Sequence, residues 1–178
     1  MVNMVSKFPA TILVLAFSSL AFAQTSPPAQ ASVAVGGKSL SVRYAAPSVR
    51  GRKIYGPGGL LSRDPTYPAW RAGANNATAF HTDADLSIGN LNVPKGDYTF
   101  YVWVKDPDAW ELIISKETGQ WGLDYHPDKD LGRVKMTMAK PPAMVEKLKY
   151  TLSSDGPKAA KLQLEWENHV ASVAMTVK

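Results

Sequence analysis

Cationic and amide side chains gather in one segment, residues 50–76, where their types and spacing could bind an anion. Five of its side chains are basic and Asp64 is its one acid, so the segment carries a formal charge of +4. Guanidinium groups pair with carboxylates or phosphates through parallel donors, and an asparagine amide both donates and accepts. Trp70 and Trp121 could add flat apolar walls for a sugar or another ring. The residues that we predict to contact a ligand are Arg50, Arg52, Trp70, Arg71, Asn75, Asn76 and Trp121.

The same segment also admits a structural interpretation. Arg71 and Asn75 would then be buried side chains that donate to loop carbonyls and hold residues 50–76 on the rest of the fold. Five glycines and three prolines leave the segment without a regular period, which indicates a long loop. Because its apolar side chains are too many to be left in water, we expect the loop to pack across the fold. The sequence leaves both interpretations open.

Two glutamates and one histidine are candidates for acid–base chemistry. Glu165 and Glu167 alternate in an extended run, so their carboxylates would project from one face about 6–7 Å apart, which suggests the paired carboxylates of glycoside hydrolysis. His126 lies in an aromatic and acidic loop. A hydrolase or isomerase of sugars or other small molecules that uses these residues is therefore the alternative to a binding protein.

Two acidic clusters contain residue types that bind metals, without the spacing of an established site. Asp83 and Asp85 alternate with His81 and would share one solvated strand face. Residues 121–130 hold three aspartates and His126 but lack the Gly and Glu positions of an EF-hand. The chain has no Cys, which excludes thiol catalysis, Cys-ligated zinc, iron–sulfur clusters and disulfides. We predict no metal and no cofactor.

The N-terminal segment, residues 1–23, has the features of a secretory signal peptide. Lys7 precedes an apolar stretch that closes on Ala21 and Ala23, which places cleavage before Gln24. The apolar stretch is too short for a spanning helix, so we expect no transmembrane segment in the mature chain and a periplasmic or extracellular location. Residues 24–38 are predicted to be a flexible tether, and residues 39–178 a single domain.

The charge distribution bears on the class of partner. The chain has a formal charge of +5, and losing Lys7 with the signal peptide leaves +4, which equals the charge of residues 50–76. The positive charge therefore lies in one loop rather than along a helix or an RNA-binding motif, and export removes most nucleic-acid partners. We predict no nucleic-acid ligand, and an anionic small molecule or an envelope glycan instead.

Alternating apolar and polar residues dominate the rest of the chain and predict β-strands. Leu40, Val42 and Tyr44 alternate with polar residues, and the same period recurs at 133–138, 146–152, 162–167 and 173–177. Residues 97–104 and 110–114 are apolar on both faces and predict central strands. About ten short antiparallel strands and one long ordered loop predict an all-β fold, an antiparallel β-sandwich of Greek-key or jelly-roll type.

Several motifs give the chain a resemblance to a known family. They lie at residues 47–56 (PSVRGRKIYG), 70–78 (WRAGANNAT), 94–98 (PKGDY), 119–122 (GQWG) and 164–167 (LEWE). With these motifs the chain resembles the bacterial domain-of-unknown-function 2911 family over about residues 39–177. The resemblance implies a secreted, β-rich protein without an assigned activity. It also implies a frequent Glu at position 76, where this chain has Asn, so no general base is expected there.

Together these features predict a secreted, non-catalytic binding module that holds an anionic or glycan ligand with residues 50–76. The enzyme that uses Glu165, Glu167 or His126 remains one alternative. A purely structural envelope protein, in which the loop only covers the core, remains the other.

Overall fold

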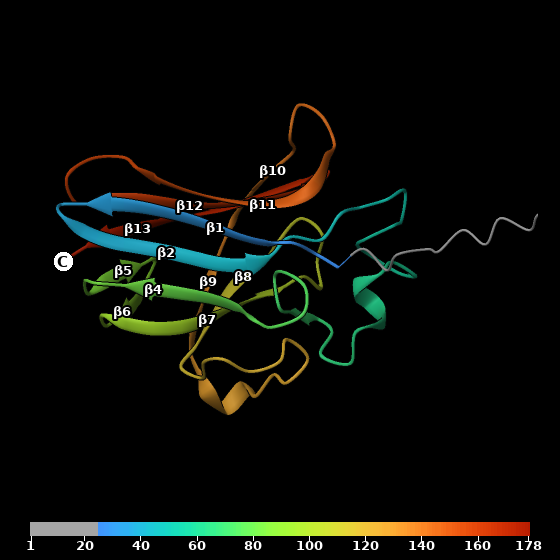
Figure 1. The fold of residues 1–178 in the computed structure, drawn as a ribbon, viewed down its shortest axis with the longest axis horizontal. Helices are drawn as coiled ribbons and strands as arrows, with labels where there is room; N and C mark the ends of the chain where they lie inside the picture. The colour runs from blue at the N-terminus through green and yellow to red at the C-terminus, as the bar shows by residue number, and fades with distance from the viewer. Residues whose placement is uncertain (1–24) are drawn as a thin grey trace, which may run out of the picture.

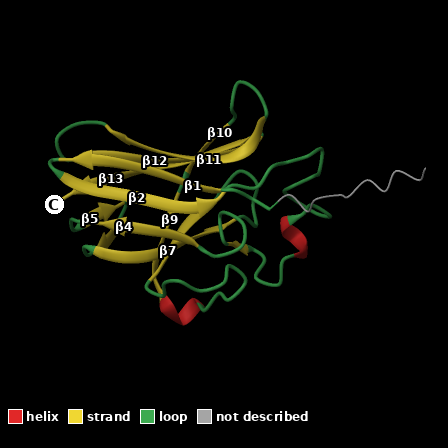
Figure 2. Ribbon diagram, viewed as in Figure 1, coloured by secondary structure: helices red, strands yellow, loops and turns green. Residues whose placement is uncertain are grey.

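The computed structural model describes residues 25–178, which form thirteen strands in two antiparallel sheets (Figures 1 and 2). The sheets pack face to face around one large apolar core, which confirms the predicted β-sandwich. Within the described range, no helix has the length and apolar character that crossing a membrane requires. The predicted signal peptide, residues 1–23, lies outside the described residues.

One sheet contains seven strands, and their order places the first strand of the chain at its edge. The order is β1 (Pro28–Val35), β2 (Lys38–Ala45), β4 (Thr78–Thr82), β7 (Gly96–Trp103), β8 (Glu111–Ser115) and β9 (Asp130–Lys135), with β3 (Ala69–Trp70) paired to β7.

The other sheet contains six strands and includes the C-terminal part of the chain. The order is β11 (Val145–Ser154), β12 (Ala159–Glu167), β13 (His169–Val177), β5 (Leu86–Ile88) and β6 (Leu91–Val93), with β10 (Thr137–Ala139) paired to β13.

Strict alternation along the strands produces the core. In β2, Leu40 and Val42 are fully buried, and in β12 every second residue from Ala160 to Trp166 is buried. Side chains of a strand point alternately to its two faces, so one face of each sheet is apolar and meets the other sheet. β7 differs because a second, smaller cluster around Tyr101 and Ile113 covers its outer face. It is buried on both sides, as the doubly apolar run predicts.

Two sequence-based predictions about strands are wrong. Residues 28–35 belong to no tether: they form β1, which pairs with β2 along its whole length, because Ala29, Ala31 and Val33 give the strand one weakly apolar face. The predicted strand at 133–138 is two strands, β9 and β10, in different sheets. The chain changes sheets at the buried Met136, as strands do at the corner of a sandwich.

The loop formed by residues 50–76 packs on the fold, at one end of the sandwich rather than across it. Ile54, Tyr55, Leu61 and Trp70 are buried in the main core, and the short turn η1 (Leu61–Arg63) lies between them. Figure 1 shows this loop, coloured cyan to green, beyond the strand ends on the side where β10 and the start of β11 lie. The apolar side chains therefore fix the loop, and its polar side chains are left to form the candidate site.

Candidate anion-binding site

Three cations of the 50–76 loop hydrogen-bond to carbonyls of the loop and its approach. Arg52 donates through Nε to Val49 O (3.0 Å) and through Nη2 to Ser48 O (2.6 Å). Lys53 donates to Pro57 O and Arg63 to Gly58 O. Several donors of these side chains therefore stabilise the conformation of the loop, a role for which the structural interpretation named Arg71 and Asn75 instead.

Arg71 has an acidic partner. Its Nη1 lies 3.0 Å from Oδ2 of Asp64, and the two side chains are 17% and 20% exposed. The aliphatic part of Arg71 passes beneath the backbone of Gly122, where a Cβ would come within 2.0 Å of Arg71 Cδ. Only a glycine at position 122 leaves room for the side chain in this position. The Nε of Arg71 is buried and has no hydrogen-bond partner within residues 25–178.

Arg52 and Arg71 line the same cavity, which has a volume of about 220 Å³. Asp64 is the one acid on its wall among residues 25–178, and Trp166 forms part of the apolar lining. Two guanidinium charges against one carboxylate leave this wall with one uncompensated positive charge. Beneath it, Trp166 is stacked on Trp70 with ring centroids 5.5 Å apart, which gives the cavity a rigid base.

The two tryptophans proposed as ligand walls occupy different environments. Trp70 is only 2% exposed and belongs to the core, so it has no free face to offer a ring. Trp121 is 46% exposed, and its backbone pairs with Asn76 next to Gly122. It lies outside the cavity between Arg52 and Arg71. Sequence types alone could not distinguish these two tryptophans.

The remaining predicted residues flank the cavity without lining it. Asn75 has a positive φ of 61° and lines a neighbouring hollow of about 460 Å³ together with Asn76 and Tyr44. Arg50 also has a positive φ, 50°, and its backbone N–H donates to Glu146 Oε1 (2.9 Å). The structure therefore divides the predicted set: Arg52 and Arg71 meet, Asn75 and Asn76 adjoin them, and Trp70 lies below.

The three residues of the predicted enzyme alternative each have a different ionic partner. Glu165 pairs with Lys149 (3.4 Å), whereas Glu167 bonds His169 (3.1 Å). His126 is 54% exposed and bonds Glu117 (2.9 Å), which raises the pKa of His126. The two glutamates thus have separate partners, and His126 has a third partner in the loop after β8.

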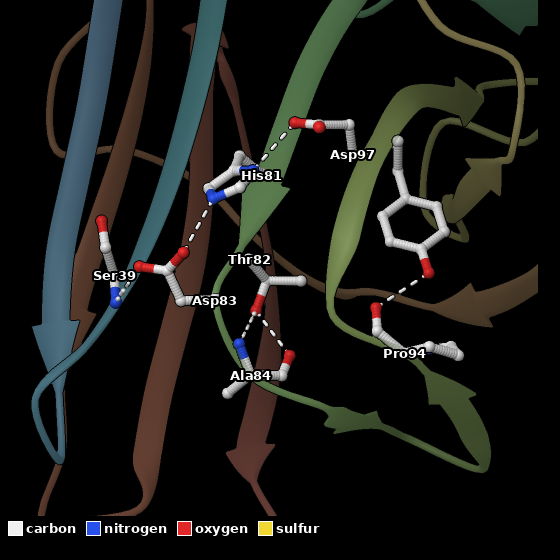
Figure 3. Close-up of polar contacts among 8 residues, drawn as sticks. Ser39, His81, Thr82, Asp83, Ala84, Pro94 and Asp97 are labelled. Atoms are coloured by element: carbon white, nitrogen blue, oxygen red, sulfur yellow. Dashed lines mark hydrogen bonds and ion pairs between the residues drawn. The ribbon is translucent and has the colours of Figure 1, made fainter.

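His81 bridges two aspartates on the solvent face, as Figure 3 shows. Its ring nitrogens lie 2.8 Å from Asp97 and 3.0 Å from Asp83, and Asp83 also accepts the backbone N–H of Ser39. Hydrogen bonds to the two carboxylates, led by that to Asp83, raise the pKa of His81. Asp85 instead accepts from Lys95 N. No group of three or more His, Asp or Glu residues in the range 25–178 is arranged to hold a metal ion.

His169 is a residue of the structure's cavities that the sequence analysis does not single out. In the structure His169 is bonded to Glu167, packs against buried aromatic rings and lines a cavity. The only sequence feature that could have indicated His169 as a site residue is its place directly after a tight turn between two amphipathic strands.

Comparisons with known proteins leave the chemistry of these sites open. Residues 26–175 match a family model described as Protein of unknown function (DUF2911). Neither curated proteins nor solved structures gave a match. The matched range includes both sheets and the whole 50–76 loop.

Proposed function

Since the chain belongs to the DUF2911 family, whose members have no stated function, we propose from its geometry that it binds a small anion with one negative charge between Arg52 and Arg71. The observation that carries the proposal is that the side chains of two arginines and one aspartate line the same cavity. An occupant of charge −1 would neutralise this wall, and interactions between charges are stronger where water is excluded.

The size and lining of the cavity favour a small carboxylate. Its volume of about 220 Å³ lies below the roughly 300–1,000 Å³ of sites for drug-sized ligands. Guanidinium groups bind carboxylates through paired N–H donors, and Leu60, Leu61 and Trp166 would contact an apolar body. The cavity is less suited to a glycan, because Trp70 has no exposed face on which a sugar ring could stack.

Binding rather than turnover is what this cavity supports. Among the described residues of the wall, the one acidic side chain, Asp64, is ion-paired with Arg71, and none is a histidine. A protein with this arrangement would recognise and retain its ligand without changing it.

Titration with simple carboxylates tests the proposal. Acetate, lactate and benzoate would be added to the purified protein, with benzamide as the uncharged match for benzoate. Trp166 on the cavity wall provides a fluorescence signal, and calorimetry gives the affinity. We expect a carboxylate but not benzamide to bind, and Arg71→Ala to weaken binding at least ten-fold. Arg63→Ala is the matched control, because Arg63 is a loop arginine bonded to a carbonyl outside the cavity.

Two further variants keep the test decisive if Arg71→Ala is unstable. Gly122→Ala would displace the Arg71 side chain by its Cβ and should also weaken binding. Asp64→Asn removes the competing negative charge and should strengthen binding of the same anion. If no carboxylate binds, or if Arg71→Ala lowers only the melting temperature, the loop is a structural cover and the proposal is wrong.

We also infer that the protein is exported. The support is the sequence of residues 1–23, with Lys7 before an apolar stretch and Ala21 and Ala23 at its end. Expression of the full chain in a Gram-negative host should yield a periplasmic or secreted protein whose N-terminal residue is Gln24. An intact N-terminus on cytoplasmic protein would contradict export.

A further inference from the structure

A second cavity, of about 460 Å³, opens where the turn between β12 and β13 meets the loop after β7 and strand β10. Asp108, Lys140, Glu167, Asn168 and His169 supply its polar wall. We propose that this cavity is a hydrolytic site in which His169 acts as the general base on small neutral esters. The proposal concerns a different cavity from the anion site and a different class of ligand.

The first support is the orientation of the imidazole. Nδ1 of His169 lies 3.1 Å from Oε2 of Glu167, and the backbone N–H of Asn168 also reaches Oε2 (3.4 Å). A carboxylate on one ring nitrogen fixes the tautomer with the proton on that nitrogen, which leaves the other nitrogen as a base. Glu167 is therefore a positioning residue and His169 the proposed catalytic residue.

The second support is the packing of the ring. Its centroid lies 5.2 Å from that of Trp110, with the planes within 13°, and 4.5 Å from that of Tyr55. Trp110 and Tyr55 are themselves only 4.9 Å apart, so both lie on the same side of the imidazole. Since Nδ1 is bonded to Glu167 and His169 lines the cavity, the nitrogen available to a ligand is Nε2. The His169 side chain is 21% exposed.

The third support is backbone strain at the positioning residue. Glu167 has a φ of +55°, which non-glycine residues adopt at a cost of about 1–3 kcal/mol. It occupies a two-residue turn, because Trp166 pairs with His169 across β12 and β13. Glycine would satisfy this turn without strain. Placing a glutamate there instead brings a carboxylate to the imidazole.

The composition of the wall defines the reaction. Its described lining contains no Ser, Thr or Cys, so water is the attacking group. Nε2 of His169 takes a proton from water as the water oxygen bonds to the ester carbonyl carbon. The carbon–oxygen bond to the alcohol then breaks, and the imidazolium returns the proton to the departing oxygen. Ester and water thus give acid and alcohol, and Asn168 and Lys140 are the donors on this wall that could stabilise the developing oxyanion.

Charge decides between neutral and anionic substrates. With His169 neutral, Asp108 and Glu167 against Lys140 leave this wall with a formal charge of −1. An anionic substrate would be repelled, whereas a neutral ester can approach through the apolar part formed by Pro107 and Met138. The two cavities therefore select ligands of different charge.

Hydrolysis of p-nitrophenyl acetate by the mature protein tests the proposal. We expect saturable, multiple-turnover release of p-nitrophenolate, lowered about 100-fold in His169→Gln, the scale of general-base catalysis. Glu167→Gln should lower kcat at least ten-fold with a smaller change in KM. His81→Gln, which removes a histidine with both nitrogens bonded to carboxylates, is the control and should leave the rate unchanged.

Two further variants distinguish catalysis in this cavity from loss of activity by unfolding and from reaction at a surface histidine. Ala139→Trp would fill the cavity from β10 while keeping His169 and Glu167 in the sequence, and it should raise KM or abolish saturation. His126→Gln removes the other histidine bonded to a glutamate, at an exposed position. A rate that follows His126, a rate no faster than that of free imidazole, or a folded His169→Gln protein with full activity would each overturn the proposal.

Discussion

Glu167 has an unfavourable backbone conformation, which the bonds of its side chain offset. Its positive φ costs free energy, while its carboxylate gains bonds to His169 Nδ1 and Asn168 N. Alanine at this position would lose the bonds and keep the strain, whereas glycine would lose both. We predict that Glu167→Gly is more stable than Glu167→Ala by about 1 kcal/mol. Urea denaturation of the two variants measures the difference, and equal midpoints would show that the turn is unstrained.

Two buried tyrosines differ in whether their hydroxyl is hydrogen-bonded. The hydroxyl of Tyr55 has no hydrogen-bond partner among residues 25–178, and burial raises its pKa well above the ordinary value. The hydroxyl of Tyr150 donates to Ala72 O at 3.0 Å. Removing an unpaired buried hydroxyl relieves a desolvation cost, but removing a paired one loses a buried hydrogen bond, although Ala72 O keeps the bond from the Thr78 hydroxyl. We predict that Tyr55→Phe gains about 1 kcal/mol and Tyr150→Phe loses about 1 kcal/mol of unfolding free energy.

Thermal and denaturant unfolding of both variants provides the measurement. A loss of stability in Tyr55→Phe would mean that its hydroxyl bonds a partner in solution. The resulting order of stabilities is independent of any ligand, because neither hydroxyl lines the two proposed sites.

Residue types predicted where a site might lie but not which atoms it would use. The 50–76 loop stood out because cations, amides and rings coincide in it, and Arg52 and Arg71 do meet at a cavity. Their partners, Ser48 O and Asp64, depend on the path of the loop. The burial of Trp70 and the contact of Tyr55 with His169 likewise come from packing between distant segments, which no local pattern encodes.

Strands were the most predictable elements because their two faces have different environments. Runs such as 39–44 and 162–167 alternate strongly, and both lie within observed strands. β1 was missed because alanines and serines give it little contrast between faces. The stronger signal was Gly36-Gly37, both with positive φ (57° and 76°), which is the requirement of a tight hairpin turn.

Hydrogen bonds through His81 connect strands β2, β4 and β7, and their contribution to stability should depend on pH. His81 in β4 joins Asp97 in β7 to Asp83, which holds Ser39 in β2. Because its folded pKa is raised above the ordinary value of 6.5, the bridge stabilises fully below pH 6.5 and is lost as pH rises through the folded pKa. The pKa of Asp83 is lowered by His81, so that contribution disappears only in acid.

His81→Gln should therefore cost more stability at pH 5.5 than at pH 9. Denaturation of wild type and variant at the two pH values measures this difference. Asp97→Asn should reduce the pH dependence in part, because it removes one of the two carboxylates. A cost that is the same at both pH values would show that the imidazolium adds nothing.

The molecule as a whole places both cavities at one end of the sandwich. Tyr55 from the 50–76 loop contacts Trp70, Trp166, Trp110 and His169. A single aromatic cluster thus supports the anion cavity and the histidine cavity. The overall sandwich followed from strand patterns, but this shared end did not, since it requires turns from both sheets to meet.

The edge position of β1 has a practical consequence for producing the protein. β1 pairs with β2 from Pro28 to Val35 and is the outermost strand of its sheet. A truncated version that begins after Gly37 would leave the amides and carbonyls of β2 open to pairing with another copy. We predict that such a truncation self-associates, as light scattering would reveal, whereas one that begins at Thr25 stays monodisperse. Residues 28–35 would then protect the edge of β2 from intermolecular pairing, which a flexible tether could not do.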